Sequence, residues 1–139
     1  MQTFMAYKTY EESLRCLDYR RLGKQRVEAM QILNTLHGKN KTNAWTNHPC
    51  VKMWKDYILE LELYHDMAIA LWIERGYNNT MKRYWDGASI KELDSIEKPQ
   101  WLTKGFCDSH RSNLLRKDKV YYSQFGWNIE DNLPYIWPR

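Results

Sequence analysis

Glu28 is a lone carboxylate in a strongly basic stretch, and this arrangement could do chemistry on a polyanion. Four cations precede it within seven residues: Arg20, Arg21, Lys24 and Arg26. On a helix with about 100° per residue, Glu28 falls on one polar face with Arg21, Lys24 and Gln25. Such a face should attract phosphates, where an acid costs affinity, so Glu28 needs a catalytic or a structural role. The structural alternative is an exposed ion pair with Lys24, four residues earlier, worth about 0.2–0.5 kcal/mol.

The amino terminus is a second candidate group. An α-amine is less basic than a lysine side chain, so more of it is neutral and nucleophilic near pH 7. Gln2 is a large residue, so we expect Met1 to be retained with a free amine. If Met1 were removed, Gln2 could cyclise and the nucleophile would be lost. An amine beside a carboxylate suits attack on the sugar C1′ of a nucleotide, with loss of the base through an iminium intermediate.

A second basic stretch, residues 109–119, interleaves cations with short polar side chains and is followed by aromatic residues. Arg111, Arg116 and Lys117, with Asn113 between them, could hold phosphates, and the aromatic rings could stack on bases. The alternative is an ordinary amphipathic helix with a solvated basic face. Two basic stretches in one small chain favour DNA as the partner.

Asn47 and His48 stand directly before Pro49, where a helix is expected to begin. These side chains and the free N–H groups of the helix could meet an anion at the rim of a site. Alternatively, one of them caps the helix. A weaker alternative is a zinc site with four ligands: His48, Cys50, Cys107 and His110. Neither ligand pair has the usual C-x-x-C spacing, so we expect no metal, and the amine chemistry needs no organic cofactor.

Hydrophobic periodicity predicts a mainly α fold, a single compact domain over residues 1–139 with three major helices and long irregular connections. The first major helix should begin after Asp18 as its cap and end near Leu36, before Gly38. The second should run from Pro49 to just before Gly76, and the third should start near Asp108 and cover residues 109–116.

Shorter elements are expected around these helices. Thr9 and Glu12 form a capping box for a short helix that ends near Cys16. The other expectations are a polar linker at 38–49, a short helix at 90–93, a helical turn through Tyr122 that ends at Gly126, and a docked apolar tail at 132–139.

Composition limits the class of protein. The chain has 139 residues, a net charge of +4 and three widely spaced cysteines, which favours reduced thiols over a disulfide framework. It has no 18-residue apolar run and no secretory h-region, so we expect a soluble cytoplasmic protein without membrane contact, and a monomer. Seven tryptophans and ten tyrosines should mostly pack in the core.

The chain resembles the pyrimidine-dimer DNA glycosylase family, the phage-type endonuclease V group. The resemblance rests on the short arm from Met1, the helix LDYRRLGKQRVEA, the NHP before the second helix and the RGY that ends it. It spans residues 1–77 and is strongest for a subgroup that carries NHP and HRSNLLRKD. In that family the terminal α-amine attacks C1′ and a helix-borne Glu completes the site. The resemblance therefore implies that Met1 and Glu28 are catalytic and that the fold is endonuclease V-like.

The chain departs from the family at three positions around the site. The family has an Arg directly before its Glu, where Val27 stands here, and another three residues after it, where Gln31 stands. A family His before the helix leucine is Arg21 here. These positions hold phosphate and opened duplex in the family, so the substrate-reading groups must differ in this chain.

The sequence predicts a DNA glycosylase with abasic-site lyase activity in base excision repair, acting on double-stranded DNA. Besides Met1 and Glu28, the residues expected to bind DNA are Arg20, Arg21, Lys24, Arg26, Asn47, His48, Arg111, Asn113, Arg116 and Lys117. Two alternatives stay open. One is a glycosylase for enzymatically modified bases, in defence or phage–host conflict. The other is a non-catalytic DNA-binding protein in which Glu28 only pairs with cations.

Overall fold

The computed structural model describes residues 1–40 and 44–138, and all regular structure within them is helical. The predicted mainly α fold class, with three major helices, is confirmed. The elements in chain order are α1 (Tyr10–Arg15), α2 (Tyr19–Leu36), α3 (Pro49–Trp54), α4 (Ile58–Glu74), α5 (Ile90–Leu93), α6 (Lys104–Lys117), α7 (Lys119–Tyr122) and a 3₁₀ turn (Ser123–Phe125). The three major helices are α2, α4 and α6.

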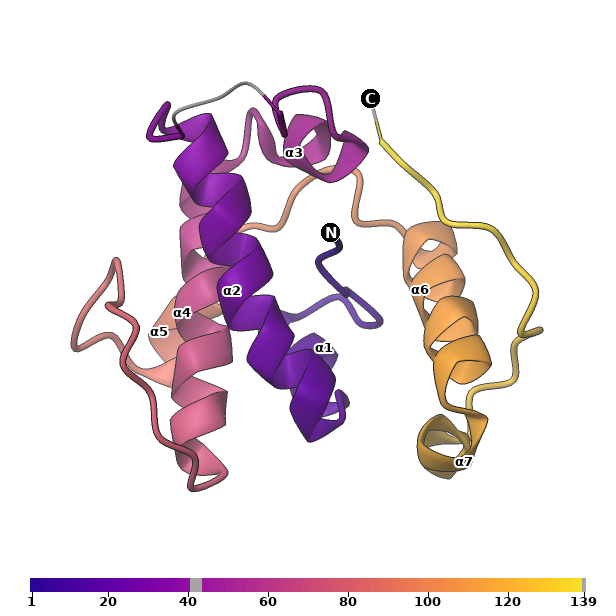
Figure 1. Cartoon of the computed structure of the whole chain (residues 1–139). Coiled ribbons are helices and arrows are strands. Elements are labelled where there is room, and N and C mark those ends of the chain that lie inside the picture. The colour runs from indigo at the N-terminus through magenta and orange to yellow at the C-terminus, as the bar shows by residue number, and fades with distance from the viewer. Residues whose placement is uncertain (41–43, 139) are drawn as a thin grey trace.

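Helices α2 and α4 form the centre of the fold and lie antiparallel, side by side (Figure 1). Gly23 permits close approach of the two helices, because a Cβ at that position would lie 3.0 Å from the Trp72 ring. The N-terminal segment runs between α2 and α6, where Phe4 and Met5 are buried (Figure 1). The first residues of the chain are therefore part of the core rather than a free arm.

Helix α2 has the predicted bounds, but Asp18 does not cap it with its side chain. The Asp18 carboxylate instead accepts a hydrogen bond from the Tyr122 hydroxyl at 2.5 Å and pairs with Arg21 at 3.0 Å. The helix ends at Leu36, and Gly38 follows with φ of +71°, a conformation that favours glycine.

The predicted second helix is wrong in one respect, because it is broken into α3 and α4. The indole N–H of Trp101 donates to the Met53 carbonyl at 2.8 Å, so that carbonyl has a partner outside the helix. The backbone then leaves the helical conformation at Tyr57, which precedes α4 with φ −135° and ψ 46°. The apolar stripe nevertheless stays continuous across the break, with Trp54 and Leu61 both fully buried.

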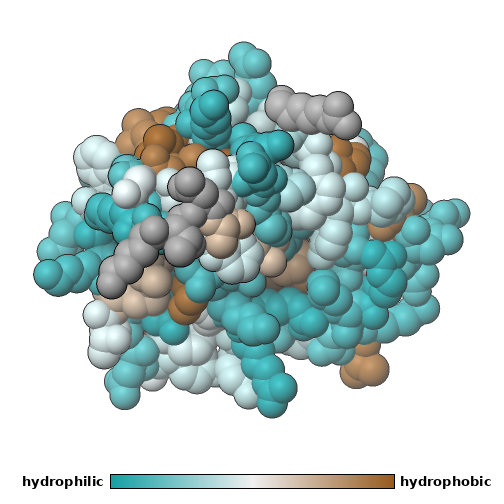
Figure 2. Space-filling model, turned by 45° about the horizontal axis from the view of Figure 1, so that its top comes forward, coloured by the Kyte–Doolittle hydropathy of each residue, from teal (hydrophilic) through white to brown (hydrophobic). Residues whose placement is uncertain are grey.

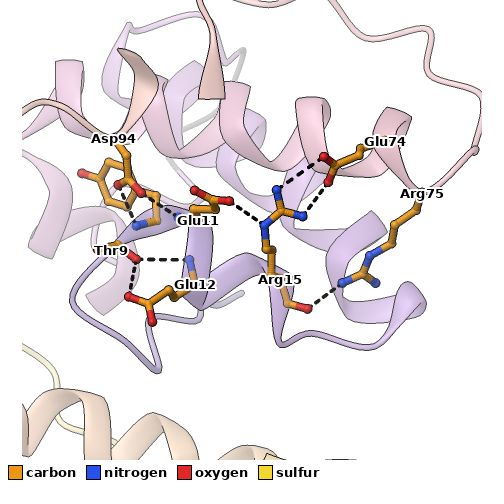
Figure 3. Close-up of polar contacts among 8 residues, drawn as sticks. Thr9, Glu11, Glu12, Arg15, Glu74, Arg75 and Asp94 are labelled. Carbon is orange, nitrogen blue, oxygen red and sulfur yellow. Dashed lines mark hydrogen bonds and ion pairs between the residues drawn. The ribbon is translucent and has the colours of Figure 1, made fainter. Parts of the chain in front are cut away.

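Helix α1 is fastened at both ends (Figure 3). At its start, the Thr9 side chain accepts from the Glu12 N–H, and the Asp94 carboxylate accepts two further backbone N–H groups. Only half of the predicted capping box forms, because the Glu12 carboxylate accepts from the Thr9 hydroxyl rather than from the Thr9 backbone N–H. At its end, the Arg15 guanidinium bridges Glu11 and Glu74, which ties α1 to the end of α4. Helix α1 is thus held by Asp94 at its start and by the end of α4 at its own end.

Helix α6 begins earlier than predicted, since Thr103 caps it through the Phe106 N–H. The 3₁₀ turn ends at Gly126, with φ of +65°, as expected. The tail packs along α6 (Figure 1), where the Leu133 N–H donates to the Ser112 hydroxyl at 3.0 Å. The predicted docking of the tail is confirmed for its described part, and residues 41–43 of the predicted linker lie outside the described residues.

The face of the molecule shown in Figure 2 is mostly hydrophilic, with its apolar residues in separate small groups. Each helix in residues 1–40 and 44–138 is too short or too polar to cross a lipid bilayer.

Candidate active site

The Gln25 side chain holds the N-terminal segment against α2. It is buried, and its Oε1 accepts from the Phe4 N–H at 2.9 Å and from the Tyr64 hydroxyl at 2.7 Å. Its Nε2 donates to the Gln2 carbonyl at 3.2 Å. The Tyr64 hydroxyl lies 2.8 Å from the Phe4 carbonyl oxygen, and burial raises the pKa of Tyr64 so that its proton is kept. These contacts pin residues 2–4 on both sides of the backbone.

Glu28 faces the same segment from one turn further along α2. Its Oε2 accepts from the Gln2 N–H at 3.3 Å and from Gln25 Nε2 at 3.2 Å. Within the described residues, Glu28 forms no ion pair with Lys24, so the alternative of an exposed pair has no support. The carboxylate is therefore directed toward the chain terminus rather than toward its own helix face.

A cleft of about 900 Å³ opens beside Met1 and Glu28. Both side chains line it, and four cations on its walls come from two separate helices: Arg20, Arg21 and Lys24 on α2, and Lys117 on α6. Among the described groups, the Met1 amine and Glu28 form no ion pair with each other, so a substrate atom could lie between them. The cleft combines an amine, a carboxylate and a positively charged wall, which suits a polyanionic substrate.

His48 and the tail lie at the rim of this site. His48 caps α3, its Nδ1 accepting from the Cys50 N–H at 3.0 Å, and its ring contacts Trp137 edge to face. Partial burial lowers the pKa of His48, and the charge of the Met1 amine lowers it further, while Glu28 acts in the opposite direction. His48 therefore lies within electrostatic reach of both candidate catalytic groups and stays neutral near pH 7.

The other residues expected to bind DNA are not in the cleft lining. Arg26 stacks on Trp72, with 4.3 Å from its guanidinium carbon to the ring centre, and donates to Asn79. Arg111 lies over Tyr7 and donates to the Ala6 carbonyl.

Asn113 is buried and, together with Arg116, holds the tail through the Leu133 carbonyl. Asn47 is exposed beside the cap of α3. Four of these five side chains thus have structural contacts in the free protein, whereas the Asn47 side chain forms no hydrogen bond with another residue in 1–40 or 44–138.

The alternative of a zinc site requires a cluster of ligand side chains. No three His, Cys, Asp or Glu side chains in the described part of the chain are placed to hold a metal ion. His110 Nδ1 accepts from the Met5 N–H at 3.0 Å, and burial lowers the pKa of His110 to about 3. This histidine therefore serves as a neutral acceptor for the N-terminal segment.

Sequence reasoning missed the residues that support the site. Helical periodicity predicts Gln25 on the polar face of α2, but the N-terminal segment covers that part of the face and buries Gln25. Gln2, Tyr135 and Trp137 line the cleft and were not expected there. Helical periodicity cannot reveal these residues, since the covering layer comes from extended segments at the two ends of the chain.

Comparison with known proteins identifies the family of this chain. Residues 1–84 match the family described as pyrimidine dimer DNA glycosylase, so the chain belongs to that family. This match covers α1 to α4 and both candidate catalytic residues. No curated protein and no solved structure matches the chain. Family membership implies a glycosylase enzyme that acts on damaged DNA in repair.

Proposed function

We propose that the protein excises a pyrimidine dimer or a related lesion from double-stranded DNA and then cleaves the strand as an abasic-site lyase. Met1 is the nucleophile through its α-amine, and Glu28 is the proton-transfer group. One observation carries the proposal: residues 1–4 fold back on α2, so that the Gln2 N–H lies 3.3 Å from Glu28 Oε2 beside a basic cleft. That contact keeps the amine of the preceding residue near the carboxylate.

The chemistry follows from these two groups. The amine lone pair attacks C1′, the C1′–N bond breaks with its electron pair going to the base, and the proton lost by the amine neutralises the departing base. Before the attack, the Glu28 carboxylate takes a proton from the Met1 ammonium, which frees the amine lone pair, and Glu28 gives that proton to O4′ as the sugar opens to an iminium. It then removes a C2′ proton, so that the 3′-phosphate leaves by β-elimination. Neither step requires a metal or an organic cofactor.

The cleft cations would hold the substrate. Arg20, Arg21 and Lys24 on one wall and Lys117 on the other can neutralise phosphates on both sides of the lesion. To reach C1′, the enzyme must open the base stack, which costs a few kcal/mol and less at a damaged base. Asn47 and His48 would contact DNA at the rim. Four further residues would have to give up their present contacts before they could bind DNA: Arg26, Arg111, Asn113 and Arg116.

Borohydride trapping on an abasic-site duplex tests this proposal. We expect a reduced covalent adduct on the Met1 α-amine, located by peptide mapping, with intact mass showing that Met1 is retained and unblocked. An adduct on a lysine would move the nucleophile and refute the assignment. No adduct, with tight and steeply salt-dependent binding, would favour the non-catalytic DNA-binding alternative. Excision assays on dimer-containing and enzymatically modified duplexes distinguish a repair glycosylase from a glycosylase for enzymatically modified bases.

A variant pair tests Glu28 directly. Glu28→Gln should reduce strand cleavage by about 10²–10⁴-fold while DNA binding survives. The matched control is Glu97→Gln, the same change at an exposed position outside the cleft, which should cleave like the wild type. Loss of binding together with cleavage in Glu28→Gln would assign Glu28 a structural role instead.

A further inference from the structure

Gln2 carries a buried hydrogen-bond donor directly beside the candidate catalytic groups. The residue is only 8% exposed and lines the cleft with Met1 and Glu28, yet its Nε2 forms no well-aligned hydrogen bond with any residue that the structure describes. An unsatisfied buried donor destabilises a protein, and buried polar groups are almost always paired. A free donor at this position therefore indicates a binding function.

The orientation of the Gln2 amide is determined by its neighbours. Its Oε1 accepts from the Thr3 N–H at 2.9 Å and faces the Cys50 thiol at 3.9 Å. Thr3 is itself fixed, since its hydroxyl accepts from the Trp54 indole at 2.9 Å. Of the two amide atoms, only the oxygen can accept a hydrogen bond from the Thr3 N–H, so exchanging the amide oxygen and nitrogen would lose this contact. The nitrogen must therefore be the end that remains free.

The tail covers this donor in the free protein. Tyr135 and Trp137 also line the cleft. Burial raises the pKa of Tyr135, while the cations Arg116 and Arg21 and the Gln2 amide lower it; the amide faces the Tyr135 hydroxyl without forming a well-aligned hydrogen bond. Within the described residues, the last hydrogen bonds that hold the tail backbone are those at Leu133. Beyond that point, ring contacts of Tyr135 with His110 and of Trp137 with His48 hold the tail. A planar base in the cleft would therefore have to displace the Tyr135 ring to reach the amide.

We propose that Gln2 Nε2 donates a hydrogen bond to the 2-oxo group of the pyrimidine whose C1′ is attacked. This inference rests on the proposed function, since it places the leaving base beside the amine of Met1. When the C1′–N1 bond breaks, its electron pair spreads over N1 and O2 of the base. A donor at O2 stabilises that charge and keeps its own proton, while the base is neutralised by the proton that the amine releases. Gln2 thus recognises a pyrimidine and stabilises it as the leaving group.

Two substrates separate base recognition from every other role of Gln2. The first is a duplex with the lesion base, and the second is the same duplex with a preformed abasic site, which has no 2-oxo group. The variants are Gln2→Glu, which keeps an acceptor for the Thr3 N–H, and Gln2→Met, which adds no charge. Gln100→Glu, exposed and outside the cleft, is the matched control. Both Gln2 variants keep a large second residue, so Met1 should be retained.

We expect base release by both variants to fall by about 10²-fold, the usual effect of losing one preorganised donor. Borohydride trapping and strand cleavage on the abasic duplex should stay within about twofold of the wild type in Gln2→Glu, which keeps the acceptor of the Thr3 N–H, and should fall less than base release in Gln2→Met, which loses it. Equal losses on both substrates would overturn the inference and reduce Gln2 to a support for Met1. Unchanged base release would overturn it as well. Absence of trapping by the wild-type protein would refute the proposed function itself, an outcome that the variants cannot imitate.

Discussion

Replacement of Gln25 by leucine should release the N-terminal segment from α2 and disable the proposed site. The change removes the acceptor of the Phe4 N–H and the donor to the Gln2 carbonyl, two backbone groups on residues that are 4% and 8% exposed. At about 1–3 kcal/mol for each unsatisfied buried group, the docked segment loses about 2–6 kcal/mol. Because the segment can detach and rehydrate these groups, the lower half of that range should apply.

Hydrogen exchange measured by mass spectrometry on the N-terminal peptide reports this loss directly. A loss of about 3 kcal/mol corresponds to about 100-fold faster exchange of the Phe4 amide. The rate of borohydride trapping on an abasic duplex should fall as well, since Met1 no longer lies beside Glu28. The control is Gln31→Leu, the same change at an exposed position of α2, which should alter neither quantity. Fast exchange in Gln25→Leu together with wild-type trapping would refute the reasoning, because the segment would then not position the amine.

Three further outcomes are expected. Lys24→Ala should reduce the slope of log affinity against log salt by about 0.9, while Lys91→Ala, exposed and outside the cleft, should leave it unchanged. Arg111→Ala should instead lower the melting temperature, since its guanidinium packs on Tyr7, and should leave the salt slope near the wild-type value. Burial lowers the pKa of His110 to about 3, so its ring resonances in NMR should not titrate between pH 5 and 8. The unfolded chain binds that proton below about pH 6.5, so His110 should make stability fall as pH drops, by at most about 1.4 kcal/mol per pH unit in urea unfolding.

The major helices could be predicted because their signals are local. Helix α2 has its expected bounds, since Gly38 supplies the left-handed conformation that ends a helix, and Thr9 caps α1 as its spacing indicated. Hydrophobic periodicity runs through the break between α3 and α4, and the hydrogen bond that the Met53 carbonyl accepts there comes from Trp101, far along the chain. Local patterns contain no information about such a contact.

The candidate site likewise combines residues that local sequence signals reveal with residues that they do not. Glu28 stands out in sequence by its charge among cations, and the chain terminus stands out by its chemistry. The neighbours that orient them do not, since Gln25 has the spacing of a solvated residue and is buried only because residues 2–4 pack over it. Arg111 was expected to face DNA, but its cation lies on an aromatic ring of the N-terminal segment. Prediction of these contacts requires the packing of extended segments, which have no periodicity to detect.

The contact between Met5 and His110 has a consequence for biosynthesis. The two residues are 105 positions apart, and the hydrogen bond that joins them holds the N-terminal segment between α2 and α6. The ribosome delivers the segment long before its partner helix, so a nascent chain that lacks α6 cannot complete the site. The protein should therefore acquire its affinity for damaged DNA only after α6 has been synthesised, and an incomplete chain released before that point should not compete with it for lesions.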